Sequence, residues 1–278
     1  MAEPAHFVSM DSEQFVKEAT AIVDNAQSRK ICLRILGALA IYIHSHDSEF
    51  IKLYLDLARN GDGNPMFTDL DLIAYKKQSR DVTKLLQDLS FKADNMVNWW
   101  FGDRMMVYEH PESKLHVDVF FNNLEYSHDV RFGDKPGSGR LELDYPTITL
   151  EDLVLEKLQP HQMGRKDAVD LIILFLAHQV RKQSEKDSID GGYIARILSD
   201  DWGFWYDSTM NLGKVKSLST DLVTQGKLAA SRSATLVATI DELRKLIDIE
   251  PKTKNWNKRA KTGINKPWYR QVEELMSN

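Results

Sequence analysis

The chain has little cysteine and no long apolar run, and each absence excludes a class of protein. Cys32 is the only cysteine, so a disulfide framework and a zinc site built from several cysteines are both excluded, which suits a reducing compartment. The strongest apolar run, residues 171–177, is far too short to span a membrane. The first residues also lack the basic-then-apolar pattern of a secretory signal. We therefore expect a cytoplasmic protein with no membrane partner.

An excess of charge of one sign is also lacking. The 278 residues include 41 acidic and 36 basic side chains, and the net charge of −5 indicates no particular partner. The length leaves room for two domains, each with its own core. Strand-like and helical segments alternate up to about residue 148, and helical patterns follow it. We expect an α+β protein with a core domain over residues 1–148 and an all-helical C-terminal domain over residues 149–278.

The expected elements follow from apolar spacing and from the turn residues between them. In the first part we expect helices over 12–26, 38–44, 48–58 and 81–91, strands over 31–36 and 67–75, a hairpin joining 104–108 to 114–122, and a short strand at 141–143. In the second part we expect helices over 150–158, 166–180, 192–198, 203–222, 231–249 and 268–276. Thr149 is the expected N-cap of the first of these, with Asp152 three residues later.

Two aspartates stand in the strand-like run Phe67–Tyr75, which follows the turn-forming residues 61–65. Because side chains alternate along a strand, Asp69 and Asp71 are expected on one face. Neighbouring carboxylates repel each other and lose hydration, which is hard to explain by stability alone. Hard oxygen ligands at this spacing suit Mg²⁺. A D-x-D pair is weak by itself, because most such pairs are solvated or lie at strand ends.

Asp118 is the expected third acid of this site. It stands in the middle of the apolar run Lys114–Asn122, where burial of an unpaired charge would be costly. The alternative is that this segment is an edge strand, on which Asp118 faces water beside His116. Earlier in the chain, the strand-like residues 31–36 break at Gly37 into a helix. That layout brings backbone N–H groups and a helix N-terminus to a phosphate, although a glycine that serves only packing would look the same.

Together, Leu36-Gly37-Ala38, Thr68-Asp69-Leu70-Asp71 and Val117-Asp118-Val119 resemble the three signatures of the nucleotidyltransferase (DNA polymerase β-like) superfamily. The segments 150–158 and 165–170 resemble the region after the core in the abortive-infection type of bacterial nucleotidyltransferase and in related uncharacterised bacterial and archaeal proteins. The resemblance covers roughly residues 30–175. It implies a nucleotidyltransferase-type mixed sheet with flanking helices.

The resemblance also implies a mechanism. Asp69 and Asp71 would hold two Mg²⁺ ions, Asp118 would share one of them, and an NTP such as ATP would transfer its nucleoside monophosphate to a hydroxyl. Gly37, Ala38 and Lys157 would meet the triphosphate. The family usually has serine or glycine where this chain has Ala38, which weakens the expected grip. The gap between Gly37 and Asp69 is also long, so residues 48–64 would be an insertion, with a flap over the site as one role for it.

The acceptor is left open. Residues 251–270 carry seven basic residues and no acid, interleaved with Trp256, Trp268 and Tyr269. This composition is typical of an RNA contact surface, and equally of a basic segment docked on an acidic body. The aromatic residues 201–206 could instead line a small-molecule pocket, although core packing is favoured there, as it is for Trp99, Trp100 and Phe101. A catalytically weak or inactive member that binds nucleotide or a partner is the remaining alternative.

Overall fold

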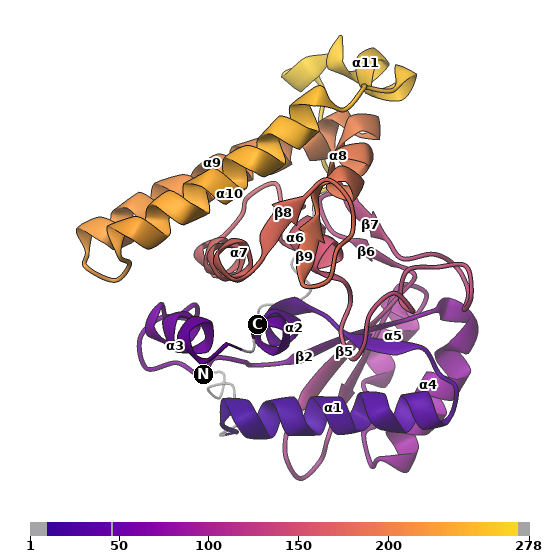
Figure 1. Ribbon diagram of the computed structural model, residues 1–278. Helices are drawn as coiled ribbons and strands as arrows, with labels where there is room; N and C mark the ends of the chain where they lie inside the picture. The colour runs from indigo at the N-terminus through magenta and orange to yellow at the C-terminus, as the bar shows by residue number, and fades with distance from the viewer. Residues whose placement is uncertain (1–9, 46, 272–278) are drawn as a thin grey trace, which may run out of the picture.

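The structure is a computed structural model that describes residues 10–45 and 47–271 (Figure 1). A five-stranded sheet in the order β1-β2-β5-β4-β3 dominates its first half. Its strands are β1 (Leu33–Ile35), β2 (Leu70–Ala74), β3 (Lys92–Ala93), β4 (Met105–Glu109) and β5 (His116–Phe121). The pair β2–β5 is parallel, whereas the other three neighbouring pairs are antiparallel. The sheet is therefore mixed, and the expected hairpin β4–β5 is confirmed.

Helices flank this sheet. They are α1 (Ser12–Ser28), α2 (Gly37–His44), α3 (Ser48–Asp56), α4 (Ser79–Asp88) and α5 (Asn95–Phe101), with a 3-10 turn η1 (Lys76–Gln78) before α4. The helix α1 begins where Asp11 accepts a hydrogen bond from the Gln14 N–H at 2.8 Å, and it buries a stripe that includes Phe15 and Ile22. The short helix α5 and strand β3 were not expected from the sequence.

A segment after the sheet carries the chain back to β1. The hairpin of β6 (Asn123–Glu125) and β7 (Asp129–Arg131) comes first. Residues 146–148 then run beside β1, where Ile35 exchanges backbone hydrogen bonds of 3.0 Å with Pro146 and Ile148. The helix α6 (Leu150–Leu158) follows directly, and the Thr149 hydroxyl caps it by accepting from the Asp152 N–H. Every residue of α6 is buried. This path places α6 against α2, at the edge of the sheet.

The residues after α6 are mainly helical. They form α7 (Arg165–Ala177), β8 (Gln179–Arg181), β9 (Ser188–Asp190), α8 (Gly191–Asp200), α9 (Trp202–Thr224), α10 (Ala230–Ile249), α11 (Lys254–Ala260) and the 3-10 turn η2 (Gly263–Asn265). The long helices α9 and α10 form an antiparallel pair across the top of the molecule (Figure 1). One buried core runs through both halves, from Phe15 to Ile247. The molecule is thus α+β, with a mixed sheet, flanking helices and C-terminal helices.

Three details differ from the expectations. The second half is not purely helical, because His178 is extended and ends α7, after which Val180 and Ile189 pair in the parallel strands β8 and β9. Residues 141–143 form a turn, closed by the hydrogen bond from Leu143 N–H to the Arg140 carbonyl, and not a strand. Residues 268–271 are not helical, and the rest of the expected helix 268–276 lies outside the described residues.

No helix within residues 10–45 and 47–271 combines the length and the apolar character needed to cross a lipid bilayer.

Candidate active site

Asp71 and Asp118 lie opposite each other on the two parallel strands of the sheet. They are direct Cα partners in the register of β2 with β5, so their side chains share one face. Burial raises the pKa of Asp71 well above its usual value, and the carboxylates of Asp69, Asp118 and Glu156 raise it further. The parallel pairing thus brings two acids together from segments far apart in the sequence.

We expected Asp69 on the same strand as Asp71. It lies near both acids, but just before the strand begins. Strand β2 begins at Leu70, which pairs with Val117, and Asp69 stands exposed in the bend before it. No neighbouring strand pairs with Asp69, and its carboxylate accepts a hydrogen bond of 2.9 Å from the Thr68 hydroxyl. Its effect on the Asp71 pKa nevertheless shows that the two carboxylates are close. The acid pair therefore consists of one half-buried and one exposed member.

Gly37 makes the turn that packs on Asp71. Its φ of +72° is in the left-handed region, and a Cβ built on it would lie 2.7 Å from Asp71 Oδ2. Both the conformation and the space therefore require glycine. The Leu36 N–H donates to the Asp71 carbonyl at 3.1 Å, which fixes the turn to β2. Ala38 follows as a buried residue in the first turn of α2, without a hydroxyl to offer.

Glu156 is a fourth acid at this place, which we did not expect from the sequence. It stands on α6, and its Oε2 accepts a hydrogen bond of 3.1 Å from the Gly37 N–H. Burial raises the Glu156 pKa, against the opposing effects of Lys157 and of the Gly37 N–H. The only sequence signal was its place beside Lys157. The backbone N–H that was expected to meet a phosphate is therefore bonded to a carboxylate in this structure.

Lys157 is buried among three acids. Its Nζ lies 3.2 Å from Glu156, 3.3 Å from Asp167 and 3.1 Å from Asp170. Burial lowers the pKa of Lys157, but these carboxylates outweigh burial and leave the pKa well above its usual value. Lys157 is therefore a fixed cation behind Glu156. To meet a triphosphate, as expected from the resemblance, its ammonium would have to exchange one of these partners.

The same ion network reaches α3. Both carboxylate oxygens of Asp170 are bonded by the Arg59 guanidinium, at 2.9 and 3.1 Å, and Asp170 Oδ1 also accepts from the Tyr54 hydroxyl at 2.5 Å. Burial raises the Asp170 pKa, but Lys157 and Arg59 outweigh it and hold the pKa below its usual value. A paired, hydrogen-bonded arrangement of this kind is what lets buried charges persist. The network fixes α3, α6 and α7 to one another.

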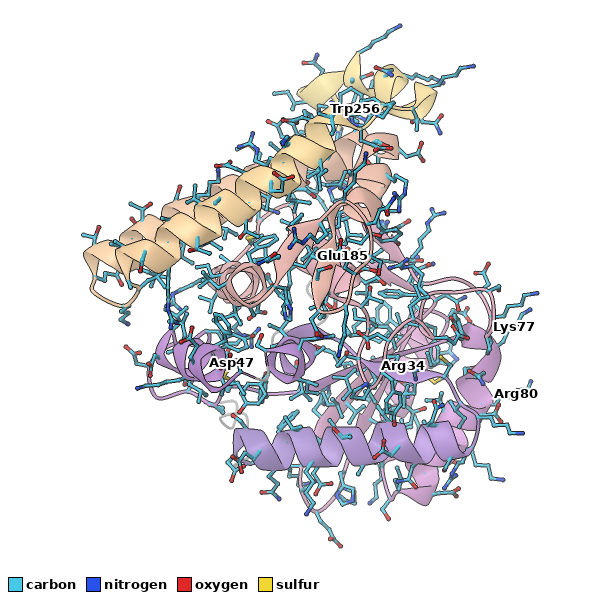
Figure 2. All side chains as sticks on the ribbon, viewed as in Figure 1. Arg34, Asp47, Lys77, Arg80, Glu185 and Trp256 are labelled. Carbon is cyan, nitrogen blue, oxygen red and sulfur yellow. The ribbon has the colours of Figure 1, made fainter. Side chains whose placement is uncertain are left out.

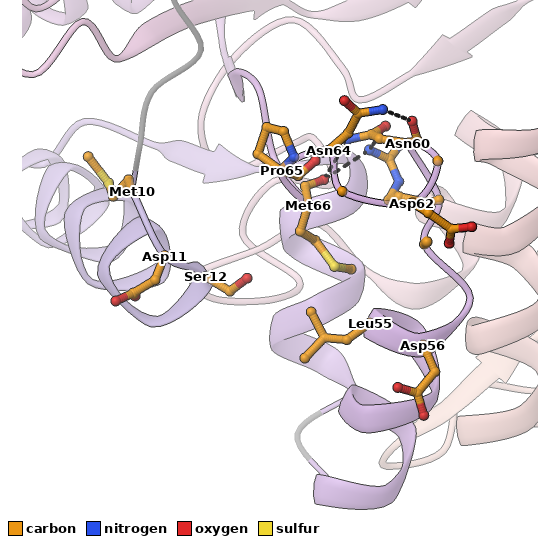
Figure 3. A pocket seen from close by; sticks show the side chains of 14 residues that line it. Met10, Asp11, Ser12, Leu55, Asp56, Asn60, Asp62, Asn64, Pro65 and Met66 are labelled. Carbon is orange, nitrogen blue, oxygen red and sulfur yellow. Dashed lines mark hydrogen bonds between the residues drawn. The ribbon is translucent and has the colours of Figure 1, made fainter.

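Residues 48–64, expected as an inserted flap, are held in place by these contacts. The Arg165 side chain also donates to the carbonyls of Leu57 and Ala58, at 2.9 Å each. Beside this segment, a hollow of about 430 Å³ lies between the start of α1, the end of α3 and the loop at 60–66 (Figure 3). Asn60 closes that loop by donating to the carbonyls of Pro65 and Met66. The hollow contains none of the acids around Asp71.

Two further side chains border the acids. His116 Nε2 lies 3.1 Å from Asp118 Oδ1, and this contact raises the His116 pKa despite the opposing effect of burial. Tyr126, in the turn between β6 and β7, is 38% exposed. Burial of its hydroxyl raises the Tyr126 pKa, and Asp71, Glu156 and Asp118 raise it further. Only His116 had a signal in the sequence, through its i, i+2 spacing with Asp118.

The acids suit a divalent cation in their chemistry. The buried Asp118 Oδ1 accepts no well-aligned hydrogen bond, and Asp71 carries a raised pKa because its neighbours are also acids. Carboxylate oxygens are the ligands that Mg²⁺ prefers. Within the described residues, however, no three His, Cys, Asp or Glu side chains stand close enough to hold a metal ion as they are placed. A metal would therefore have to draw the exposed Asp69 toward Asp71 and Asp118.

The basic segment 251–270 is only partly a free surface. Its aromatic residues are half-buried: Trp256 packs edge-on against Trp205, Trp268 Nε1 donates to Asp207 at 3.0 Å, and Tyr269 stacks on His161 at 3.6 Å. Arg259 donates to backbone carbonyls, and Arg270 pairs with Asp129. Four lysines are exposed and make no ion pair with any described acid: Lys254, Lys258, Lys261 and Lys266. The segment offers charge but little aromatic surface.

Asp207 anchors this segment to the body. It lies buried on α9, and it is bonded by His128 Nε2 at 2.8 Å and His161 Nδ1 at 3.0 Å as well as by Trp268. These hydrogen bonds outweigh burial and lower the Asp207 pKa. Nearby, Trp202 and Phe204 are buried, as core packing of residues 201–206 requires.

The site thus consists of a parallel strand pair that carries Asp71 and Asp118, with Gly37 and Glu156 packed above it and Asp69 and Tyr126 at its border. A comparison of the chain with known protein families, curated proteins and solved structures finds no match to any of them.

Proposed function

We propose that the protein is a Mg²⁺-dependent nucleotidyltransferase, which transfers a nucleoside monophosphate from an NTP to a hydroxyl acceptor. One observation carries the proposal. Asp71 and Asp118 are Cα partners on parallel neighbouring strands, with Asp69 two residues before Asp71. Among the described residues, only the exposed imidazole of His116 lies within ion-pair distance of any of these three acids. Acids gathered without compensating charge are costly, and they are typical of sites that bind metal ions.

The residues would have separate roles. When bound, two Mg²⁺ ions would lower the pKa of the acceptor hydroxyl and steady the pyrophosphate leaving group. Asp71, which neighbours both other acids, would hold its carboxylate between those of Asp69 and Asp118. Gly37 lets the backbone approach this point closely, because any side chain there would collide with Asp71. The chain itself would supply position and charge, which is most of what such a transfer requires.

The reaction would form one bond and break one. The acceptor oxygen would attack the α-phosphorus, the bond from that phosphorus to the bridging oxygen would break, and pyrophosphate would leave. The acceptor's proton would pass to water. Tyr126, with its ring partly exposed and its hydroxyl toward the acids, would border the nucleotide and limit the entry of water.

The acceptor is either RNA or a small molecule. For RNA, the exposed lysines of residues 251–270 would contribute phosphate contacts, and their lack of acidic partners among the described residues supports this role. A second candidate function is a catalytically weak protein that binds nucleotide or a partner. The hydrogen bond between Gly37 and Glu156 favours it, because that bond uses a phosphate-binding N–H, and Ala38 supplies no hydroxyl in its place.

The test is incubation with each of the four α-labelled NTPs and Mg²⁺, with and without total RNA. The proposal predicts labelled product that is lost in Asp71→Asn and when Mg²⁺ is chelated. Label transfer that depends on added RNA identifies the acceptor class. NTP binding without transfer under any condition would favour the second candidate, and neither binding nor transfer would overturn both.

A further inference from the structure

The most exposed aromatic surface of the described residues lies on α5. Trp99 and Trp100 are 76% and 69% exposed, and their rings contact each other edge to face with centroids 4.7 Å apart. Met96, one turn earlier, is also exposed. The expectation from the sequence, that these tryptophans pack inside, is wrong for both. Tryptophan normally buries about 150–250 Å² when it packs, so two neighbouring rings in water point to a binding surface.

The helix that carries them is firmly placed. The Asn98 side chain bonds the backbone of Val107 twice, accepting from its N–H at 2.7 Å and donating to its carbonyl at 3.1 Å. Asp94 caps the start of α5 by accepting from the N–H groups of Met96 and Val97. These contacts cover the edge of β4 that β3 leaves free, and they turn the tryptophans outward. The exposed rings therefore belong to an ordered helix.

This helix lies beside the acid-bearing strands. Val107, which Asn98 holds, is also the Cα partner of Asp118 in the β4–β5 pair. Neighbouring strands are about 4.8 Å apart, so α5 begins one strand beyond Asp118. A polymer bound along α5 would therefore lie within one strand of the strand that carries Asp118.

One cation lies at the end of α5, and two more follow it in the sequence. Lys76 Nζ lies 3.4 Å from Asp103 and donates to the Gly102 carbonyl that follows the helix. Lys77 and Arg80 continue from Lys76 along η1 and α4, and both project outward from the sheet half (Figure 2). Residues 76–104 contain six basic and four acidic residues, in a chain whose overall charge is −5. Of those four acids, Asp94 is bonded at its helix cap, Asp88 pairs with Arg29 and Asp103 pairs with Lys76.

We propose that Trp99 and Trp100 form a stacking platform for single-stranded RNA, which the neighbouring cations hold by its phosphates. Exposed aromatic rings among cations are the composition that binds single strands, because every base has a face that can stack. RNA, which carries a hydroxyl on each ribose, fits the acceptor chemistry, and this delivery of an acceptor to Asp118 rests on the proposed function. The platform differs from residues 251–270, whose aromatic side chains are packed and which include α11 at the top of the molecule, whereas α5 lies beside the sheet (Figure 1).

Binding of a fluorescein-labelled 12-nucleotide oligouridylate at low salt tests the platform. Trp99→Leu/Trp100→Leu keeps the apolar character and removes the stacking faces, so we expect its Kd to rise about tenfold or more. Trp99→Phe/Trp100→Phe keeps the stacking faces and should stay within about threefold of the wild type. Lys77→Ala/Arg80→Ala should weaken binding and flatten its dependence on salt. Because all four side chains are exposed or partly exposed, unchanged thermal unfolding should confirm that each variant is folded.

Two controls separate the platform from nonspecific apolar binding and from the acid site. Met210→Ala removes another exposed apolar side chain, which is 53% exposed and lies outside both α5 and residues 251–270, and should leave Kd unchanged. Asp71→Asn should bind the oligonucleotide like the wild type. RNA binding without label transfer to any acceptor would therefore keep the platform and overturn the proposed function. Transfer to RNA that the Leu variant leaves unaffected would overturn the platform and keep the proposed function.

Three outcomes would overturn the platform. They are no binding by the wild type at low salt, equal affinity of the Leu variant and the wild type, and a wild-type dimer that the Leu variant converts to monomers in sedimentation. The last outcome would assign the tryptophans to an interface between two copies of the chain.

Discussion

Glu156 and Gly37 are joined by a hydrogen bond from a backbone N–H to a buried carboxylate, 3.1 Å long. This bond places a negative charge at the start of α2, where the proposed reaction needs a triphosphate. The charge is held by Lys157 on one side and lies near Asp71 on the other. A buried carboxylate and a triphosphate close to it carry charge of the same sign, so they repel each other strongly.

Glu156→Gln should therefore tighten NTP binding. Glutamine keeps the volume and an oxygen that can accept from the Gly37 N–H, but it removes the charge. We expect the Kd for Mg²⁺–NTP to fall by roughly tenfold, since one such repulsion is worth about 1.4 kcal/mol. Isothermal titration calorimetry measures it. Glu151→Gln is the matched control, because Glu151 is a buried acid on the same helix that bonds Arg140 instead. Weaker binding by Glu156→Gln would mean that the carboxylate itself holds the substrate or its metal.

Asp71→Asn should abolish transfer and yet stabilise the metal-free protein. The folded pKa of Asp71 is raised, so above its ordinary pKa of about 3.9 the unfolded chain loses a proton that the folded chain keeps. Stability therefore falls as the pH rises through the folded pKa. Asparagine removes this effect, so we expect the metal-free variant to be more stable than the wild type at pH 7.

Below about pH 4 that gain should vanish, because both states are then protonated. Urea unfolding at pH 7 and pH 4 measures the difference. Asp103→Asn, at a fully exposed acid, should be neutral at both pH values. An unfolded Asp71→Asn would indicate that the carboxylate serves the structure.

Added Mg²⁺ should raise the melting temperature of the wild type in a concentration-dependent way, because an ion bound only to the folded state stabilises it. Asp118→Asn should lose most of this shift, since Asp118 Oδ1 is a buried oxygen without a well-aligned hydrogen bond. Differential scanning calorimetry with 0 to roughly 100 Kd of Mg²⁺ would show up to about 2.7 kcal/mol of stabilisation. An equal shift in both proteins would place the ion elsewhere.

Asp207→Asn should destabilise the protein at pH 7 by about 2–4 kcal/mol, because His128, His161 and Trp268 all bond this one buried carboxylate. The Asp207 pKa is lowered in the folded state, so its contribution is full above about pH 4 and disappears as the pH falls through the folded value. Thermal unfolding across this range measures it. Asp201→Asn at the neighbouring N-cap should cost only about 1 kcal/mol or less.

If both lysines contact phosphates, Lys258→Ala/Lys261→Ala should reduce the slope of log binding constant against log salt concentration by about two. Neither lysine has an ion-pair partner among the described acids, so the fold should not change. NTP binding near Asp71 should also be unchanged. Binding measured from about 50 to 200 mM salt gives the slope. An unchanged slope would leave Trp99 and Trp100 as the surface to test.

Much of the fold could be predicted because local patterns decided it. The apolar stripe of α1, the Thr149 cap of α6 and the hairpin β4–β5 each depend on neighbouring residues, and all three are confirmed. Asp71 and Asp118 were expected on adjacent strands, and they are Cα partners on β2 and β5, but the parallel pairing that aligns them was not predicted.

What could not be predicted depends on tertiary contacts. Glu156 faces the site only because residues 146–148 bring α6 beside β1. The aromatic run at Trp99 looked like core, but two backbone bonds from Asn98 settle which face of α5 turns outward. The strands β8 and β9 have only three residues each. An alternating apolar and polar pattern of that length cannot be distinguished from the end of the helical pattern of α7.

The ion network around Asp170 has a consequence for how the chain is made. Arg59 and Tyr54 emerge from the ribosome 111 and 116 residues before the carboxylate that both of them bond. Until α7 is synthesised, neither side chain has the carboxylate against which it is buried, so α3 cannot settle against its final neighbours. A fragment ending near residue 148 would keep the acids of β2 and β5 but lose the helix that orders α3. The site should therefore be completed late in synthesis, after α7 has been made.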